Sequence, residues 1–120
     1  MIKGFEEHTA PLKPEQMEIV YWIERLFTGG TEFTVPSSSK PVKAPILCRA
    51  IQDMFEPSFK ESTLRQCINW LRQNGSVPIL SSSKGYWTTR DTEEIRDNID
   101  SLEQRANSIQ TAADGLRRFV

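Results

Sequence analysis

Histidine and cysteine are scarce in this chain, whose 120 residues include one histidine, His8, and two cysteines, Cys48 and Cys67. A metal centre needs several such ligands close together, so we expect no metal site. No histidine is placed to act as a base for a cysteine or serine, no core pair of carboxylates is suggested, and no glycine-rich phosphate loop occurs. The sequence therefore predicts a protein that is not an enzyme and needs no cofactor.

Long apolar runs are also missing. No stretch approaches the ~20 residues of a membrane span, and the first residues are too polar and acidic for a signal peptide. We therefore expect no contact with a membrane and a protein that stays in the compartment where it is made. Both cysteines fall within predicted helices, and there they are expected to be reduced and packed.

A net charge of −1 gives the whole chain no excess of either sign, but its charges are segregated. Residues 35–90 carry eight bases against three acids, a net of +5, whereas residues 1–34 and residues 91–120 each have a net of −3. Such segregation is typical of a protein with one anion-binding face and acidic flanks. An ordinary solvated surface is also compatible with a +5 segment.

Periodicity and turn residues predict a mainly α-helical chain with a small β-hairpin (α+β). The expected order is a helix from Pro14 to the glycines at 29–30, a short strand at 31–35, helices at about 45–54 and 59–74, a hairpin of runs 77–80 and 85–89, and a long helix that Asp91 or Thr92 begins. Two short helices followed by a hairpin form a winged helix-turn-helix. The predicted divisions are a flexible N-terminal tail (1–12), the winged helix-turn-helix domain (13–90) and a C-terminal dimerisation helix (91–120).

The helix at about 59–74 has two contrasting sides. Leucine, isoleucine and cysteine at 64, 67, 68 and 71 form a core side, and the opposite side carries Ser62, Gln66, Asn69 and Gln73. Amide side chains can pair with adenine in the major groove, and flanking arginines can reach phosphates. We therefore expect a recognition helix, although an exposed polar face without a ligand is the plain alternative.

The turn of the hairpin supplies hydroxyls, a cation and backbone N–H groups, which suit phosphate or minor-groove contacts. Tyr86 and Trp87 alternate along the second strand, so one is expected to point inward. Recognition helix and wing together give the predicted DNA-binding set: Lys60, Ser62, Arg65, Gln66, Asn69, Arg72, Gln73, Ser81, Ser82, Ser83 and Lys84.

The stretch from Leu64 to Gly75, the run at 77–80 and the sequence Ser-Lys-Gly-Tyr at 83–86 resemble the winged helix-turn-helix domain at the N-terminus of the biotin-operon repressor. The resemblance covers about residues 44–89. The whole chain is similar to small phage-encoded winged-helix proteins, in which such a wing precedes a long helix. The resemblance implies a DNA-binding fold, a role in regulation or replication, and the cytoplasm of a bacterial host cell.

The last predicted helix carries a heptad repeat, the signature of a coiled coil. Apolar residues alternate at spacings of four and three, namely Ile95, Ile99, Leu102, Ala106, Ile109, Ala113, Leu116 and Val120, and we refer to these eight as the heptad seam. A seam of this length needs a partner. The partner could be the chain's own first helix or a second copy, and we favour a homodimer, either parallel or antiparallel.

Taken together, these patterns predict a sequence-specific double-stranded DNA-binding protein, a transcription regulator of a phage or bacterium. Its recognition helix, about 59–74, would enter the major groove, and its wing, 81–85, would touch the backbone or minor groove. A winged helix that binds a host protein is one alternative, which the acidic ends favour. A replication or packaging accessory protein that uses the same DNA contacts is the other.

Overall fold

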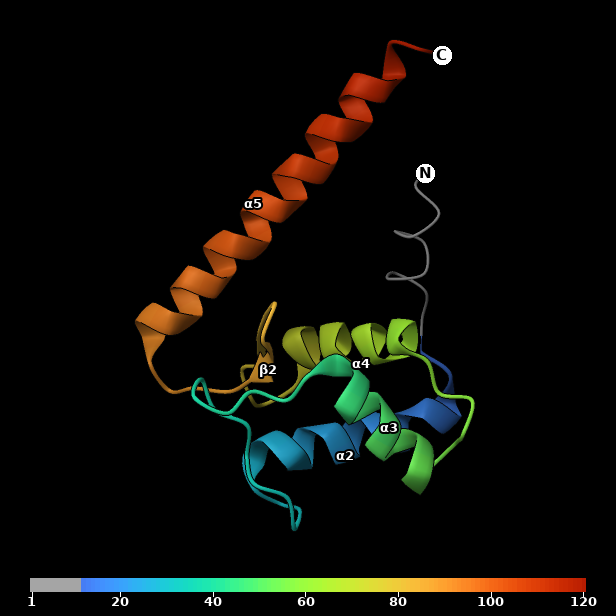
Figure 1. The fold of residues 1–120 in the computed structure, drawn as a ribbon, viewed down its shortest axis with the longest axis vertical. Coiled ribbons are helices and arrows are strands. Elements are labelled where there is room, and N and C mark those ends of the chain that lie inside the picture. Colours follow the sequence, from blue (N-terminus) through green and yellow to red (C-terminus); the bar gives the residue numbers. More distant parts are fainter. Residues whose placement is uncertain (1–11) are drawn as a thin grey trace. The chain divides into compact units, whose positions relative to one another are not determined.

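The computed structural model describes residues 12–120 of the chain, which are mainly α-helical with a two-stranded β-hairpin and a long C-terminal helix, as predicted (Figure 1). The chain divides into two compact units, of which the first ends at Thr89 and the second begins at Arg90. The predicted tail lies outside the described residues, His8 included, except for Leu12. Leu12 is partly buried against the hydrophobic core.

The first helical segment begins at Pro14, as the sequence indicated. A 3₁₀ turn, Pro14–Gln16, leads directly into α2, Met17–Thr28. Proline suits this position because its fixed φ matches the helix and its missing N–H would have no partner there. The helix ends at Gly29, whose φ of 88° lies in the left-handed region that glycine adopts without strain. Its buried side chains are Ile19, Val20, Trp22, Ile23, Leu26 and Phe27.

The two short helices of the domain are α3, Ala44–Met54, and α4, Glu61–Asn74. The segment between them is anchored by Phe59, whose side chain is 2% exposed. Gln52 of α3 donates a hydrogen bond from its side-chain Nε2 to the Phe59 carbonyl at 2.8 Å. The burial of the Phe59 side chain and the hydrogen bond to its carbonyl therefore hold the connection between α3 and α4 in place.

The hairpin pairs β1, Leu80–Ser82, with β2, Gly85–Trp87, in antiparallel register, with Ser81 opposite Tyr86. The predicted first strand is wrong over residues 77–79, where Pro78 has no N–H to donate to a partner strand. The predicted end of the second strand is wrong at 88–89, because the Thr88 N–H donates to the Pro36 carbonyl instead, at 3.1 Å. The hairpin is thus shorter than its β-prone runs.

The predicted strand at 31–35 does not form, and a neighbouring segment takes its place beside the hairpin. The Thr31 hydroxyl accepts a hydrogen bond from the Phe33 N–H at 3.2 Å, which bends the backbone where a strand would have to extend. Val42 instead bridges Tyr86, with N···O distances of 2.9 and 2.8 Å in the two directions. The third chain segment beside the hairpin is therefore residues 36–42.

The hydrophobic core lies between α2, α3 and α4, with Phe59 and Ile79 closing it from the connecting segments. Its most deeply buried side chains from the three helices include Val20, Ile23, Phe27, Leu47, Ile51, Leu64, Cys67, Ile68 and Leu71. Leu64, Cys67, Ile68 and Leu71 are the predicted core side of α4. This burial fixes the rotation of α4 about its axis and so decides which of its side chains face away from the core.

The second unit consists mainly of α5, Thr92–Arg117. Asp91 precedes it, and its carboxylate accepts a hydrogen bond from the Glu93 N–H at 3.0 Å, which satisfies one of the free amides of the first turn. No residue of α5 is buried. The helix ends three residues before Val120, so the last member of the heptad seam lies outside it.

Candidate nucleic-acid interface

The side of α4 opposite the core carries the predicted recognition residues. Lys60 immediately precedes the helix and is exposed, as are Arg65 and Gln73. Ser62, Gln66 and Asn69 are half-buried. The structure therefore places the whole predicted row away from the core, but most of its polar side chains are less open to solvent than the helical pattern indicated.

Arg72, predicted as a phosphate contact, lies on the flank of α4 that meets the wing. Its Nε donates to the Ile79 carbonyl at 2.8 Å, and its Nη2 donates to the Ser81 hydroxyl at 2.8 Å. Both interactions connect the C-terminal half of α4 to the start of the wing. The structure thus brings Arg72 and Ser81 together. Both residues connect the wing to α4, a role that their spacing along the sequence did not predict.

The tip of the wing is a two-residue turn, Ser83 and Lys84, between paired Ser82 and Gly85. Ser82, Ser83 and Lys84 are exposed, and the Ser82 hydroxyl accepts a hydrogen bond from the Lys84 N–H at 3.1 Å. Gly85 has φ of 127°, and a Cβ there would lie 2.4 Å from the Val42 carbonyl oxygen. Only glycine fits this position, so Gly85 lets the hairpin lie close against the backbone of Val42.

Tyr86 is the inward residue of the predicted Tyr86/Trp87 alternation. It packs against the core, and this burial raises the pKa of its phenol. The positive charges of Arg72 and then Arg65 act in the opposite direction and lower that pKa. Both guanidinium groups therefore lie near enough to the wing strand to influence Tyr86. Arg65, the wing and the flank of α4 belong to one surface.

Exposed bases on this surface have no acidic partners within the domain. Lys60, Arg65 and Lys84 form no salt bridge with any residue between 12 and 120. Lys40, Lys43 and Arg49 are exposed as well. Much of the positive charge of residues 35–90 therefore lies at the surface, in contact with solvent. An arrangement of this kind attracts phosphates, because its cations are not neutralised internally.

The two cysteines are buried in the core and form no disulfide. Desolvation is the main cause that raises the pKa of both thiols, that of Cys67 to about 12. A thiol with such a pKa is a poor nucleophile and a poor metal ligand near neutral pH. Between residues 12 and 120 no group of three or more potential metal ligands occurs.

None of the helices that the structure describes has the length and apolar composition of a membrane span. No protein-family model, no curated protein and no solved structure matches the chain.

Proposed function

We propose that the chain is a double-stranded DNA-binding protein that acts as a transcription regulator, with α4 in the major groove and the wing tip on the backbone or in the minor groove. The observation that supports this most strongly is the set of three exposed bases, Lys60, Arg65 and Lys84, at the start of α4, along α4 and at the wing tip. Arg72 joins α4 to the wing through its hydrogen bonds to the Ile79 carbonyl and the Ser81 hydroxyl.

The role of each residue in DNA binding follows from the chemistry of its side chain. Lys60, Arg65 and Lys84 contact phosphates, which position the protein without reading sequence. Gln66, Asn69 and Gln73 read base edges through their amides, adenine above all. Ser62, Ser82 and Ser83 donate hydroxyl hydrogen bonds to phosphates or bases, whereas Arg72 and Ser81 hold the wing in place.

A second copy of the chain is the partner that we propose for the heptad seam. Within α5, Ile99, Ile109 and Leu116 are 46%, 55% and 66% exposed, respectively. A contiguous apolar stripe of this size on a helix indicates an interaction surface. Pairing two copies doubles the number of recognition helices for one DNA molecule, which is how two-fold symmetric regulators bind palindromic sites.

A salt series on random duplex DNA tests the electrostatic part of the proposal. Affinity should fall steeply as salt rises, because phosphate contacts release counterions. Arg65→Ala and Lys84→Ala should each lower the slope of log K against log salt by about 0.9. Arg25→Ala, which removes an arginine of α2 that is also exposed, is the matched control and should leave the slope unchanged. Absence of duplex binding even at low salt would contradict the proposal.

Selection of bound fragments from a random DNA pool tests the base-reading part. Asn69→Ala should change the selected sequence and cost about 1–3 kcal/mol on the original site. An equal loss on all sequences would contradict base reading by α4.

Two alternatives make different predictions in these experiments. A winged helix that binds a host protein would use its acidic ends, residues 1–34 and 91–120, which each have a net charge of −3. Such a protein would show no duplex affinity at any salt concentration, whereas a replication or packaging accessory protein would bind duplexes without selecting a sequence. The two DNA experiments therefore separate all three functions.

A further inference from the structure

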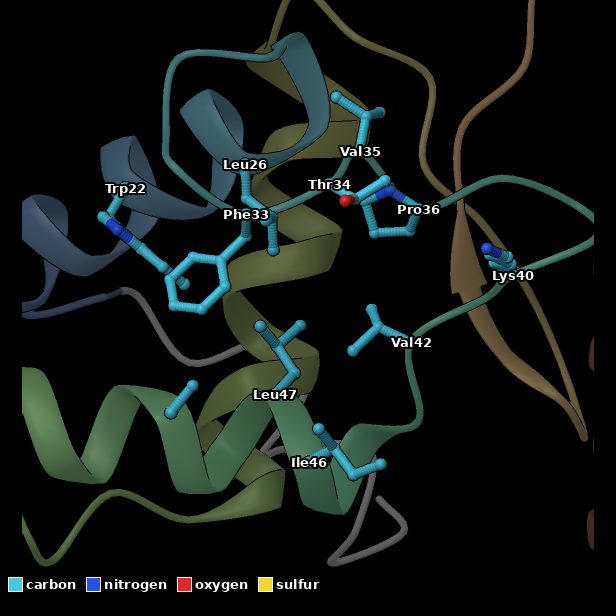
Figure 2. Close-up of a pocket in the computed structure, with 11 residues that line it drawn as sticks. Trp22, Leu26, Phe33, Thr34, Val35, Pro36, Lys40, Val42, Ile46 and Leu47 are labelled. Carbon is cyan, nitrogen blue, oxygen red and sulfur yellow. The ribbon is translucent and has the colours of Figure 1, made fainter.

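An apolar cleft of about 280 Å³ opens on the domain between α2, residues 33–42 and the first turns of α3. Figure 2 shows the side chains that surround it, with Trp22 and Phe33 at one side and Val42 and Ile46 at the other. Among the described residues that line it, polar side-chain groups come only from the indole of Trp22, from Thr34 and from Lys40. Its location differs from that of the proposed DNA-binding residues, none of which lines it.

The floor of the cleft is buried, with Trp22, Leu26 and Leu47 less than 9% exposed, but two of its large apolar side chains are open to solvent. Phe33 is 47% exposed and Ile46 is 62% exposed, although both are large apolar side chains. Phe33 meets Trp22 edge-to-face, with 6.1 Å between ring centroids. Leaving such surface in water is unfavourable by roughly 25 cal/mol per Å². A molecule that covered these side chains would therefore gain binding free energy from the cleft itself.

The dimensions and charge of the cleft define the class of molecule that fits. A dry cavity of about 150 Å³ holds a benzene molecule, so one of 280 Å³ accommodates a fused pair of rings. Lys40 is exposed, forms no salt bridge within the described part of the chain, and has no acidic neighbour among the described lining residues. Its ammonium group complements a carboxylate.

We propose that this cleft binds a small aromatic carboxylate, with the rings against Trp22 and Phe33 and the carboxylate toward Lys40. Figure 2 shows Lys40 beyond Pro36 and Val42, at the edge of the cleft. The proposal adds a ligand site to the domain and does not depend on DNA binding.

Occupation of the cleft has a direct consequence for the wing. Residues Pro36 and Val42 line the cleft with their side chains, while their backbones hydrogen-bond to β2 and to Thr88 just after it. A ligand that fixes this segment also protects the amides of Val42, Tyr86 and Thr88, which make those hydrogen bonds. If the wing contacts DNA as proposed above, ligand and DNA will change each other's affinity by the same factor, because coupling between two sites is reciprocal.

Three probes of matched ring size test the proposal without DNA. 1-Naphthoate should bind the full chain and shift the NMR signals of the Trp22 indole and the residues 33–42. Naphthalene, which lacks the charge, should bind about 10-fold more weakly, and 1-naphthylmethylamine should bind more weakly still. Hydrogen exchange of the Tyr86 and Thr88 amides should slow at least 3-fold with saturating naphthoate.

Variants of residues that line the cleft test whether the probes bind there and not elsewhere on the chain. Lys40→Ala should weaken naphthoate at least 5-fold and leave naphthalene unchanged, whereas Lys43→Ala, at an exposed base that does not line the cleft, should change neither. Ala50→Phe, which places a ring in the cleft from α3, should abolish binding of all three probes. Absence of naphthoate binding up to its solubility, equal affinity for the three probes, or equal effects of Lys40→Ala and Lys43→Ala would overturn the proposal. None of these outcomes bears on the affinity for duplex DNA.

Discussion

Leucines in the two units of the chain have opposite environments. Leu71, in α4, is 1% exposed, whereas Leu116, in α5, is 66% exposed. The same contrast holds for whole helices, because each of α2, α3 and α4 buries at least three apolar side chains and α5 buries none. The apolar sides of α2, α3 and α4 are largely used in folding, while that of α5 remains available for association.

The contrast has an energetic basis. An isolated helix is marginally stable in water, and most of its stability in proteins comes from packing of its apolar side. α5 has 26 residues and local support from Asp91 at its start and from an Asp114–Arg117 ion pair near its end. Exposed pairs of this kind contribute only ~0.2–1 kcal/mol. The physical requirement for a partner therefore falls on α5 and its heptad seam, not on the domain.

The largest expected difference between the units concerns folding. Leu71→Ala should lower the free energy of unfolding of the domain by about 2–5 kcal/mol, because it leaves a cavity in a closely packed core. Leu116→Ala should leave domain unfolding unchanged at concentrations where the chain is monomeric. Chemical denaturation followed by Trp22, Trp70 and Trp87 fluorescence measures both. A loss above 1 kcal/mol for Leu116→Ala in the monomer would mean that α5 is part of the domain's fold.

The next difference concerns association. Ile109→Asp should weaken self-association at least ~100-fold, because burial of an unpaired carboxylate costs several kcal/mol and 1.4 kcal/mol is a factor of ten. Ser108→Asp adds the same charge at an exposed position outside the heptad seam and should have little effect. Sedimentation equilibrium of both variants at matched concentration measures the change. Equal behaviour of the two would exclude the seam as the dimer surface.

Much of the fold was predictable because local signals and burial agree. Pro14, Gly29 and Gly75 flank helices at the expected places, and the 3.6-residue period of α4 gave its core side correctly. The strand at 31–35 was wrong for a local reason, the Thr31 hydrogen bond to Phe33. The pairing of Val42 with Tyr86 could not be predicted, since it joins residues far apart in sequence and no periodic pattern marks a single bridge.

The sequence predicted which residues of α4 face away from the core, but not what each residue of the candidate site contacts. The faces of α4 follow from helical geometry, so the placement of Gln66, Asn69 and Gln73 away from the core was available from the sequence. The hydrogen bonds of Arg72 to Ile79 and Ser81 depend on how close the wing lies to α4, which sequence spacing does not give. The cleft beside Lys40 was missed for the same reason, because its walls come from three separate segments.

The orientation of two α5 helices follows from the charges beside the heptad seam. In a parallel pair the residues that meet across the seam are Asp91 with Arg96, Asn98 with Glu103, Arg105 with Gln110 and Ala112 with Arg117. The one oppositely charged pair uses Asp91, whose carboxylate already accepts a hydrogen bond from the first turn of α5. In an antiparallel pair with Ile109 beside Ala113 of the other copy, the seam overlaps from Leu102 to Val120, Ile95 and Ile99 lie outside the overlap, and Glu103 meets Arg117 twice. We therefore expect the antiparallel arrangement.

The smallest expected effect tests this orientation. Glu103→Arg should weaken the dimer by a few-fold, because it replaces two exposed attractions of ~0.2–1 kcal/mol each by repulsions. Arg117→Glu alone should also weaken it, and the double variant should recover the original affinity, since the exchange restores both pairs. A parallel dimer would show no recovery, because Glu103 and Arg117 then lie two helical heptads apart. The comparison of single and double variants at low and high salt thus decides the orientation, since salt screens the gain only where the charges meet.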